Sequence, residues 1–243
     1  MPPWRNKPNM SSSLHDRTIV LAGGSGGLGS VSAQMLAAEG ARVLVSYKSN
    51  RERAEALPAT AVQADLTITA DRTRLLDTAK DLYGLVVFTG IPSRNATEEV
   101  MRASLEANYL GPILLAREAA ERMKDAGIPG AIVLFSTMQA VSLFPGSTAY
   151  GAPKAALIHA AQILAKECRG PANIRVNVIC PGVKQAGMAE ASIATGKYER
   201  YLKDNIIPRY GRATDVARAV RFFLEPDNYI TGQVLTVDGG LTL

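Results

Sequence analysis

A glycine-rich segment between an apolar run and a helical pattern most constrains how this chain can fold. Thr18–Ala22 is a short continuous apolar stretch, which is typical of a strand buried on both faces. Glycines then follow at Gly23, Gly24, Gly26, Gly27 and Gly29. The apolar spacing of residues 30–40 predicts a helix that ends at its final glycine. Strand, glycine turn and helix together form a phosphate cradle, because the backbone approaches closely and the helix start offers free N–H groups. We therefore expect a dinucleotide at this turn.

The same alternation continues along the chain. Further apolar runs predict strands at residues 41–47, 61–64, 84–90, 131–135, 174–180 and 233–237, and helical patterns lie between most of them, including residues 97–109 and 112–126. This order predicts a single-domain Rossmann fold, in which a doubly wound parallel β-sheet of about seven strands is flanked by helices on both faces. Residues 1–15 are polar and carry three prolines, so we expect a disordered tail before one domain over residues 16–243.

Composition excludes several classes of function. With 47% hydrophobic residues but no apolar run that could span a bilayer, and no signal-like apolar stretch near the start, we expect a cytoplasmic protein without a membrane partner. Cys168, Cys180, His15 and His159 lack metal-binding spacing, so no metal site is expected. The net charge is +5, but the cations are scattered among acids, and we expect no nucleic-acid partner.

The end of the second predicted strand indicates which dinucleotide is bound. Enzymes that prefer NAD place an acid beside the adenosine ribose, about 20 residues beyond the glycine turn. Here the strand runs into Tyr47, Lys48 and Ser49, with Arg51 shortly after, and no acid is present. Two cations at this place favour NADP(H) over NAD(H), because they could attract a 2′-phosphate. The alternative is that Lys48 and Arg51 only decorate a solvated helix start.

Other polar residues follow predicted strands, where ligands of open parallel sheets gather. Asp65 follows the third strand, and its carboxylate could meet the adenine edge or simply cap the next helix. Ser136 and Thr137 follow the strand at residues 131–135. Residues 183–208 come after a later strand and are long enough to form a lid.

Tyr150 and Lys154 stand four residues apart at the start of an alanine-rich helix. Positions i and i+4 share one helix face, so the phenol and the ammonium point into the same space. A nearby cation stabilises the phenolate and lowers the pKa of a tyrosine from its usual value of about 10. The pair is therefore a candidate for proton transfer.

Taken together, these features resemble the short-chain dehydrogenase/reductase family from about residue 16 to the end of the chain. The resemblance rests on Gly23-x-x-x-Gly27-x-Gly29, Asp65-Leu66-Thr67, Asn108, Tyr150-x-x-x-Lys154, Pro181-Gly182 and the ending Tyr229–Gly240. Within the family the chain looks most like the 3-oxoacyl-[acyl-carrier-protein] reductase branch, from its length, its ending and the segment Arg209–Asp215.

The resemblance implies an NADP(H)-dependent oxidoreductase that reduces a carbonyl group, such as a 3-oxoacyl thioester or another small ketone, to an alcohol. Tyr150 would be the general acid/base, and Lys154 would lower its pKa and bind the nicotinamide ribose. Thr137, rather than Ser136, falls at the place of the family's catalytic serine. Asn108 would hold a water that links Lys154 to solvent.

The resemblance also implies which residues bind the cofactor and how the chain assembles. The implied cofactor-binding residues are Gly23, Ser25, Gly26, Gly27, Leu28, Gly29, Tyr47, Lys48, Ser49, Asp65, Leu66, Thr89, Gly90, Tyr150, Lys154, Pro181, Gly182 and Val183. The expected partners are a small-molecule carbonyl or alcohol substrate and other copies of the chain, in a homotetramer or a dimer. The apolar faces of Ile113–Met123 and Ala155–Lys166 could pack on such a copy or on the sheet.

Three positions depart from the family pattern. Ala22 replaces a threonine whose side chain braces the glycine turn, and Phe88 replaces an asparagine whose amide ties the sheet to its neighbours. Ala186 stands where a threonine would contact the nicotinamide carboxamide. These departures leave a second function open, a dinucleotide-binding sensor or scaffold of the same fold with weak or no catalysis. Retention of Asn108 and of the other three proton-relay residues argues for the enzyme.

Overall fold

The computed structural model describes residues 14–93 and 95–243. Its centre is a seven-stranded sheet with the order β3-β2-β1-β4-β5-β6-β7, in which all neighbouring strands are parallel. The strands are β1 Thr18–Ala22, β2 Arg42–Tyr47, β3 Thr60–Gln63, β4 Leu82–Val87, β5 Ala131–Phe135, β6 Arg175–Pro181 and β7 Val234–Val237. The predicted fold class is confirmed.

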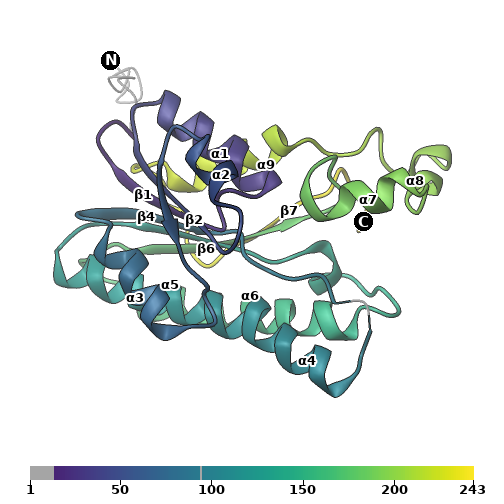
Figure 1. The fold of residues 1–243 in the computed structure, drawn as a ribbon, viewed down its shortest axis with the longest axis horizontal. Helices are drawn as coiled ribbons and strands as arrows, with labels where there is room; N and C mark the ends of the chain where they lie inside the picture. The colour runs from purple at the N-terminus through teal and green to yellow at the C-terminus, as the bar shows by residue number, and fades with distance from the viewer. Residues whose placement is uncertain (1–13, 94) are drawn as a thin grey trace, which may run out of the picture.

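Helices cover both faces of the sheet (Figure 1). One face carries α1 (Gly27–Ala38), α2 (Arg51–Glu55) and α9 (Ala213–Leu224), and the other carries α3 (Thr69–Asp77), α4 (Glu98–Leu105), α5 (Gly111–Asp125) and α6 (Thr148–Glu167). Successive residues of a strand point to opposite faces, so each strand serves both layers. In β1, Val20 and Ala22 belong to one core cluster and Ile19 and Leu21 to the other. This explains why the strands read as continuous apolar runs.

The order of the strands places a crevice at one edge of the sheet. From β1 the chain adds strands outward to β3 and then returns to β4 on the other side. The loops after β1 and β4 therefore leave the sheet toward opposite faces, and the gap between them is the usual ligand site of such sheets.

The predicted separate helices over residues 97–109 and 112–126 are wrong, because the helical path does not break between them. A π-helical segment, Glu106–Leu110, joins α4 directly to α5. Gly111 and Pro112 suggested a boundary, and Pro112 has no N–H to donate to the preceding turn, but the π-helical turns carry the helical path past it without a break. Single π turns inside α-helices are frequent at functional sites.

Two further predictions concern the N-terminal tail and the segment that follows β6. The predicted tail ends at residue 15, but Leu14 is already fully buried in the core cluster beneath α1. Residues 1–13 of that tail lie outside the described residues. Residues 183–208 contain two short helices, α7 (Glu190–Ala194) and α8 (Glu199–Lys203), which project beside the carboxyl edge of the sheet (Figure 1).

The described chain has no helix with both the length and the apolar character needed to cross a bilayer. Across residues 14–93 and 95–243, no group of three or more His, Cys, Asp or Glu side chains is arranged to bind a metal.

Candidate active site

A cleft of ≈ 790 Å³ opens where β1, β4, β5 and β6 end. The predicted site residues that line it are Gly23, Ser25, Gly26, Gly27, Leu28, Gly29, Tyr47, Lys48, Asp65, Leu66, Thr89, Gly90, Thr137, Tyr150, Lys154, Pro181, Gly182 and Val183. Ser49 and Asn108 do not line the cleft. The first lies on the exposed loop after β2, and the second is fully buried.

The glycine turn has the geometry of an anion cradle. Gly23 has a φ of +74°, which an L side chain rarely adopts. A Cβ on Gly29 would lie 2.6 Å from the Cα of Gly24, so this residue lets the first turn of α1 pack on the loop. The N-cap Gly26 has no side chain that could accept hydrogen bonds from that turn. The free N–H groups and the helix dipole are therefore available to a diphosphate, and the site fits a dinucleotide.

Ser46 braces this turn in place of the threonine that is missing at residue 22. The backbone N–H of Gly23 donates to the Ser46 hydroxyl at 2.8 Å. Ser46 belongs to β2, whose register with β1 places it beside the turn. The departure at Ala22 therefore leaves the turn hydrogen-bonded from a different strand.

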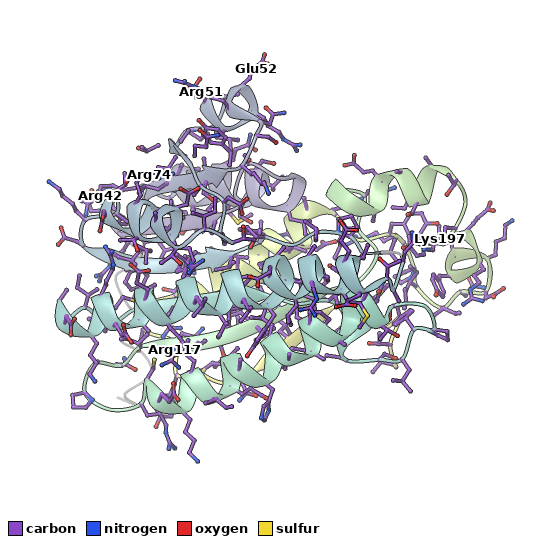
Figure 2. All side chains as sticks on the ribbon, turned by 60° about the horizontal axis from the view of Figure 1, so that its bottom comes forward. Arg42, Arg51, Glu52, Arg74, Arg117 and Lys197 are labelled. Atoms are coloured by element: carbon purple, nitrogen blue, oxygen red, sulfur yellow. The ribbon has the colours of Figure 1, made fainter. Side chains whose placement is uncertain are left out.

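Of the two cations noted after β2, Lys48 lines the cleft and Arg51 does not. Lys48 Nζ pairs with the Asp65 carboxylate at 2.6 Å, and both residues line the cleft. Arg51 does not line the cleft, because its side chain pairs with Glu55 one turn along α2, at the outer edge of the molecule in Figure 2. Arg53 lines the cleft instead. A short helix after a strand can present either residue inward, and the sequence does not reveal which.

Asp65 forms a local turn rather than a helix cap. Its carboxylate accepts hydrogen bonds from the backbone N–H and the hydroxyl of Thr67, and the N-cap of α3 is Ile68. Burial opposes ionisation, but the hydrogen bond from Lys48 and those from Thr67 hold the pKa of the Asp65 carboxyl below its usual value. The carboxylate thus remains charged and paired at the cleft wall.

Thr137 and Tyr150 meet in the cleft as predicted. Both residues line the cleft, and the Thr137 side chain acts on the Tyr150 phenol as a hydrogen-bonding neighbour, whereas the Ser136 hydroxyl is engaged elsewhere and donates to the Lys154 backbone carbonyl at 2.9 Å. Gly151 lets the start of α6 approach this corner, because a Cβ there would lie 2.7 Å from the backbone oxygen of Gln139. Thr137 was chosen over Ser136 by counting the residues that separate it from Tyr150 in the family pattern. The positions of the two hydroxyls agree with that choice.

The expected lowering of the tyrosine pKa is not found. Burial raises the pKa of Tyr150 to about 12, and the hydrogen bond from Thr137 opposes this only in part. The ammonium of Lys154 does not stabilise the phenolate here, because its Nζ donates to the backbone oxygens of Thr89 at 3.0 Å and Phe135 at 2.8 Å. Complete burial lowers the pKa of Lys154 to about 7. Spacing along α6 alone could not show where the lysine side chain finds its partners.

Asn108 lies in the π-helical segment, behind the cleft wall. Its amide accepts from the Ile91 N–H at 3.0 Å and donates to the Ile91 carbonyl at 3.1 Å, which fixes the chain after β4. A Cβ on Gly90 would lie 2.6 Å from Asn108 Oδ1 and 3.2 Å from Lys154 Nζ. The amide and the ammonium therefore border the same small space, which only glycine leaves open.

A proline inside α6 connects this helix to α4. Pro153 has no N–H, so the carbonyl of Ala149 lacks its usual donor within the helix. The Ser104 hydroxyl donates to that carbonyl and in turn accepts from the Asn108 amide at 2.8 Å. The start of the helix that carries Tyr150 is thereby held against the helix that carries Asn108.

The other two departures have different consequences. The Phe88 ring packs against Phe135, with ring centroids 4.4 Å apart, so an aromatic contact occupies the place of the missing amide. Ala186 is buried and offers no hydroxyl to a ligand. The next residue, Gly187, lies against the glycine turn, because a Cβ on Gly27 would be 2.7 Å from its backbone nitrogen.

Several residues that line the cleft were missed, namely Ser46, Arg53, Ser93, Gln139, Lys184, Glu190 and Lys197. They carry no motif, and most lie in loops or short helices whose orientation depends on packing. Only Ser46 had a usable signal, since the register of β1 and β2 places it beside the turn.

A dinucleotide cradle beside a half-buried Tyr and a buried Lys and Thr is the site of a dinucleotide-dependent oxidoreductase. A family model described as enoyl-(acyl carrier protein) reductase matches residues 22–242. The 3-oxoacyl-[acyl-carrier-protein] reductase of Rattus norvegicus is 33% identical, over 94% of this chain and 99% of the rat protein. An NADPH-dependent aldehyde reductase of Arabidopsis thaliana is 30% identical, over 95% of each chain. The solved structure of a short-chain type dehydrogenase/reductase from Mycobacterium ulcerans aligns with a TM-score of 0.85 at 28% identity, over 94% of this chain and 90% of the other.

This chain belongs to the short-chain dehydrogenase/reductase family, whose members are NAD(P)-dependent enzymes that act on alcohol and carbonyl groups. The predicted family is confirmed.

The pKa of Lys154 predicts how stability depends on pH. The pKa of this lysine is ordinarily 10.5 in the unfolded chain, and burial lowers it to about 7 in the folded protein. Between these values the unfolded chain holds a proton that the folded protein lacks, so stability should rise as the pH rises from 7 toward 10.5. We expect the free energy of unfolding of wild type, minus that of Lys154→Met, to increase by up to roughly 1.4 kcal/mol per pH unit.

Chemical denaturation at pH 7, 8, 9 and 10 measures this difference. The exposed Lys80 provides the matched control, since Lys80→Met should differ from wild type by an amount that does not change with pH. A pH-independent difference for Lys154→Met would show that its ammonium is charged in the fold.

Proposed function

We propose that this chain is an NADP(H)-dependent reductase of 3-oxoacyl thioesters or other small ketones. The observation that carries the proposal is that Thr137, Tyr150 and the buried Lys154 line the same cleft as the glycine turn. A protein that only bound a dinucleotide would need the turn but not these three side chains.

The roles follow from the positions of these groups. A bound nicotinamide dinucleotide supplies the hydride. Tyr150 donates a proton to the carbonyl oxygen, and burial favours this direction because it keeps the phenol protonated at neutral pH. Thr137 orients the same oxygen through its hydroxyl. Lys154 holds the nicotinamide ribose, and Asn108 completes the relay by holding a water near the ammonium.

Cofactor choice depends on the wall formed by Lys48 and Arg53. Asp65 neutralises part of the Lys48 charge, whereas no ion pair within the described part of the chain involves the Arg53 side chain. A guanidinium binds phosphate in a bidentate manner, so Arg53 is the main recognition group for a 2′-phosphate in this proposal.

We expect Arg53→Ala to weaken NADPH binding about tenfold while NADH binding changes little, because one charge-assisted contact is lost. Fluorescence titration of each dinucleotide gives both dissociation constants. Arg51→Ala is the matched control, since its guanidinium pairs with Glu55 and does not line the cleft. Equal losses for NADPH and NADH in Arg53→Ala would contradict the assignment of the 2′-phosphate site.

Assembly and location are also part of the proposal. Most of the apolar face of α5 packs on the sheet, and Leu115, Ala119 and Met123 on this face are fully buried. Leu114 on α5 and Ile163 on α6 remain exposed, and an apolar groove lies between α4 and α6. These surfaces support association into a dimer or tetramer. Both cysteines are free thiols, which supports a cytoplasmic location.

Initial-rate assays test the proposed function. NADPH and NADH oxidation are followed by absorbance with β-ketoacyl thioesters, quinones, diketones and keto sugars, and the reverse reaction with the matching alcohols. The proposal predicts turnover with NADPH. Binding of NADPH without turnover in either direction would instead support a sensor or scaffold. Binding of neither dinucleotide would refute the assignment of the glycine turn as a dinucleotide-binding site.

A further inference from the structure

Two buried hydroxyls without partners lie in the same cleft. Within the described residues, Thr89 Oγ1 and Ser93 Oγ are the buried side-chain oxygens that have no hydrogen-bond partner. Both residues line the cleft. Buried polar atoms in folded proteins are nearly always paired, because an unpaired one loses its hydration without compensation. Two exceptions in one cleft indicate that a ligand supplies the missing partners.

The path of the chain separates the two hydroxyls. Thr89 lies against the glycine turn, since a Cβ on Gly23 would be 2.9 Å from its Cγ2. The chain then passes Lys154 at Gly90 and is fixed by the Asn108 amide at Ile91. Thr89 therefore lies on the dinucleotide side of the relay, and Ser93 follows the relay residues along the chain while it lines the same cleft.

Ser93 is also held firmly enough to recognise a ligand. The residue is only 8% exposed, although its segment is a loop. Both polar backbone groups of Ile91 are bonded to Asn108, which fixes the chain two residues before Ser93. A hydroxyl in such a position can donate one hydrogen bond and accept others without a large loss of side-chain freedom.

We propose that Ser93 is a specificity-determining residue whose hydroxyl binds a second oxygen atom of the substrate. This inference rests on the proposed function, and it narrows the substrates to carbonyl compounds that carry a further keto, hydroxyl or ester oxygen near the reacting carbonyl. A simple ketone leaves the Ser93 hydroxyl unpaired. The unpaired group then costs binding free energy both in the substrate complex and in the transition state.

Neutral diketones of increasing length test this proposal. The probes are 2,3-butanedione, 2,4-pentanedione and 2,5-hexanedione, with 2-hexanone as the ketone that lacks a second oxygen. For at least one diketone, we expect Ser93→Ala to lower the ratio of its kcat/KM to that of 2-hexanone about tenfold, as the loss of one hydrogen bond predicts. The NADPH dissociation constant should not change.

The thermal stability of the same variants gives an independent result. Ser93→Ala removes an unpaired buried hydroxyl, so its Tm should stay equal to that of wild type or rise. Ser104→Ala is the matched control, because that buried hydroxyl is paired with Ala149 and Asn108, and its Tm should fall. A fall for Ser93→Ala as large as that for Ser104→Ala would show that the hydroxyl has a structural partner.

The outcomes separate this inference from the function on which it rests. Wild type and Ser93→Ala could show the same ratio of kcat/KM for every diketone to kcat/KM for 2-hexanone. In that case Ser93 does not recognise the substrate, bound water satisfies its hydroxyl, and the reductase function stands. If wild type reduces none of these compounds, nor those of the wider panel, the proposed function itself fails. A diketone to 2-hexanone ratio that is lower in Ser93→Ala than in wild type supports both the role of Ser93 and the reductase function.

Discussion

Replacing Tyr150 by Phe is expected to lower kcat for carbonyl reduction by about a thousandfold, because the proton donor is lost while the rest of the cleft remains. NADPH binding and Tm should change little, since the phenol oxygen contacts Thr137 but makes no bond to the glycine turn. Steady-state rates, fluorescence titration and thermal melts on the same preparation measure the three quantities.

A second tyrosine provides the control for this experiment. Tyr109 packs against the core next to the cleft wall but does not line the cleft, so Tyr109→Phe should keep the activity of wild type. The pH profile adds a further check, because a phenol whose pKa is about 12 stays protonated, and reduction should not decline from its ionisation below about pH 11. Substantial residual activity in Tyr150→Phe would assign the proton to another group.

Adding one methyl group at Gly90 should have the next largest effect. The Cβ of Gly90→Ala would lie 2.6 Å from Asn108 Oδ1 and 3.2 Å from Lys154 Nζ, so both groups must move. We expect the free energy of unfolding to fall by about 1–3 kcal/mol, as overpacked cores do. We also expect kcat to fall on the order of a hundredfold, since small displacements of positioned groups are costly.

A double variant identifies the cause of that loss. If the methyl group acts by clashing with the amide, Gly90→Ala combined with Asn108→Ala should be less destabilised than the sum of the two single variants. Additive losses would mean that the methyl group acts through Lys154 or through the backbone. Denaturation curves for the four proteins provide the coupling free energy, and rates show whether activity follows it.

Local patterns were sufficient for the architecture and for part of the site. Thr18–Ala22 and the glycines after it predicted the cradle, because a buried strand, a turn without side chains and a helix start are all encoded within about 20 residues. Tyr150 and Lys154 share a helix face for the same reason. The choice of Thr137 over Ser136 came from the family resemblance, and the contact with the phenol agrees with it.

Predictions failed where a charged side chain had alternative partners. Arg51 was considered as a cation that could attract a 2′-phosphate, with a solvated helix start as the alternative. It pairs with Glu55, and Arg53 lines the cleft. Lys154 was expected to lower the pKa of Tyr150, but its Nζ donates hydrogen bonds to the backbone carbonyls of Thr89, just after β4, and Phe135, at the end of β5. The pair of Arg51 and Glu55 is a local i, i+4 contact that the pattern of cations alone did not reveal. The partners of Lys154 depend on which atoms the packed sheet brings within hydrogen-bond distance.

The sequence by itself determined the doubly wound sheet, the glycine cradle and the i, i+4 pair, since each depends on residues that are neighbours along the chain. Only the tertiary structure decided that Ser46 braces the turn, that a π-helical segment buries Asn108, and that Ser93 lies in the cleft without a partner. These features arise from contacts between β1 and β2 or between helices and strands that are distant in sequence. Hydrogen bonding and burial of a polar side chain are properties of the packed whole, so they become visible only in three dimensions.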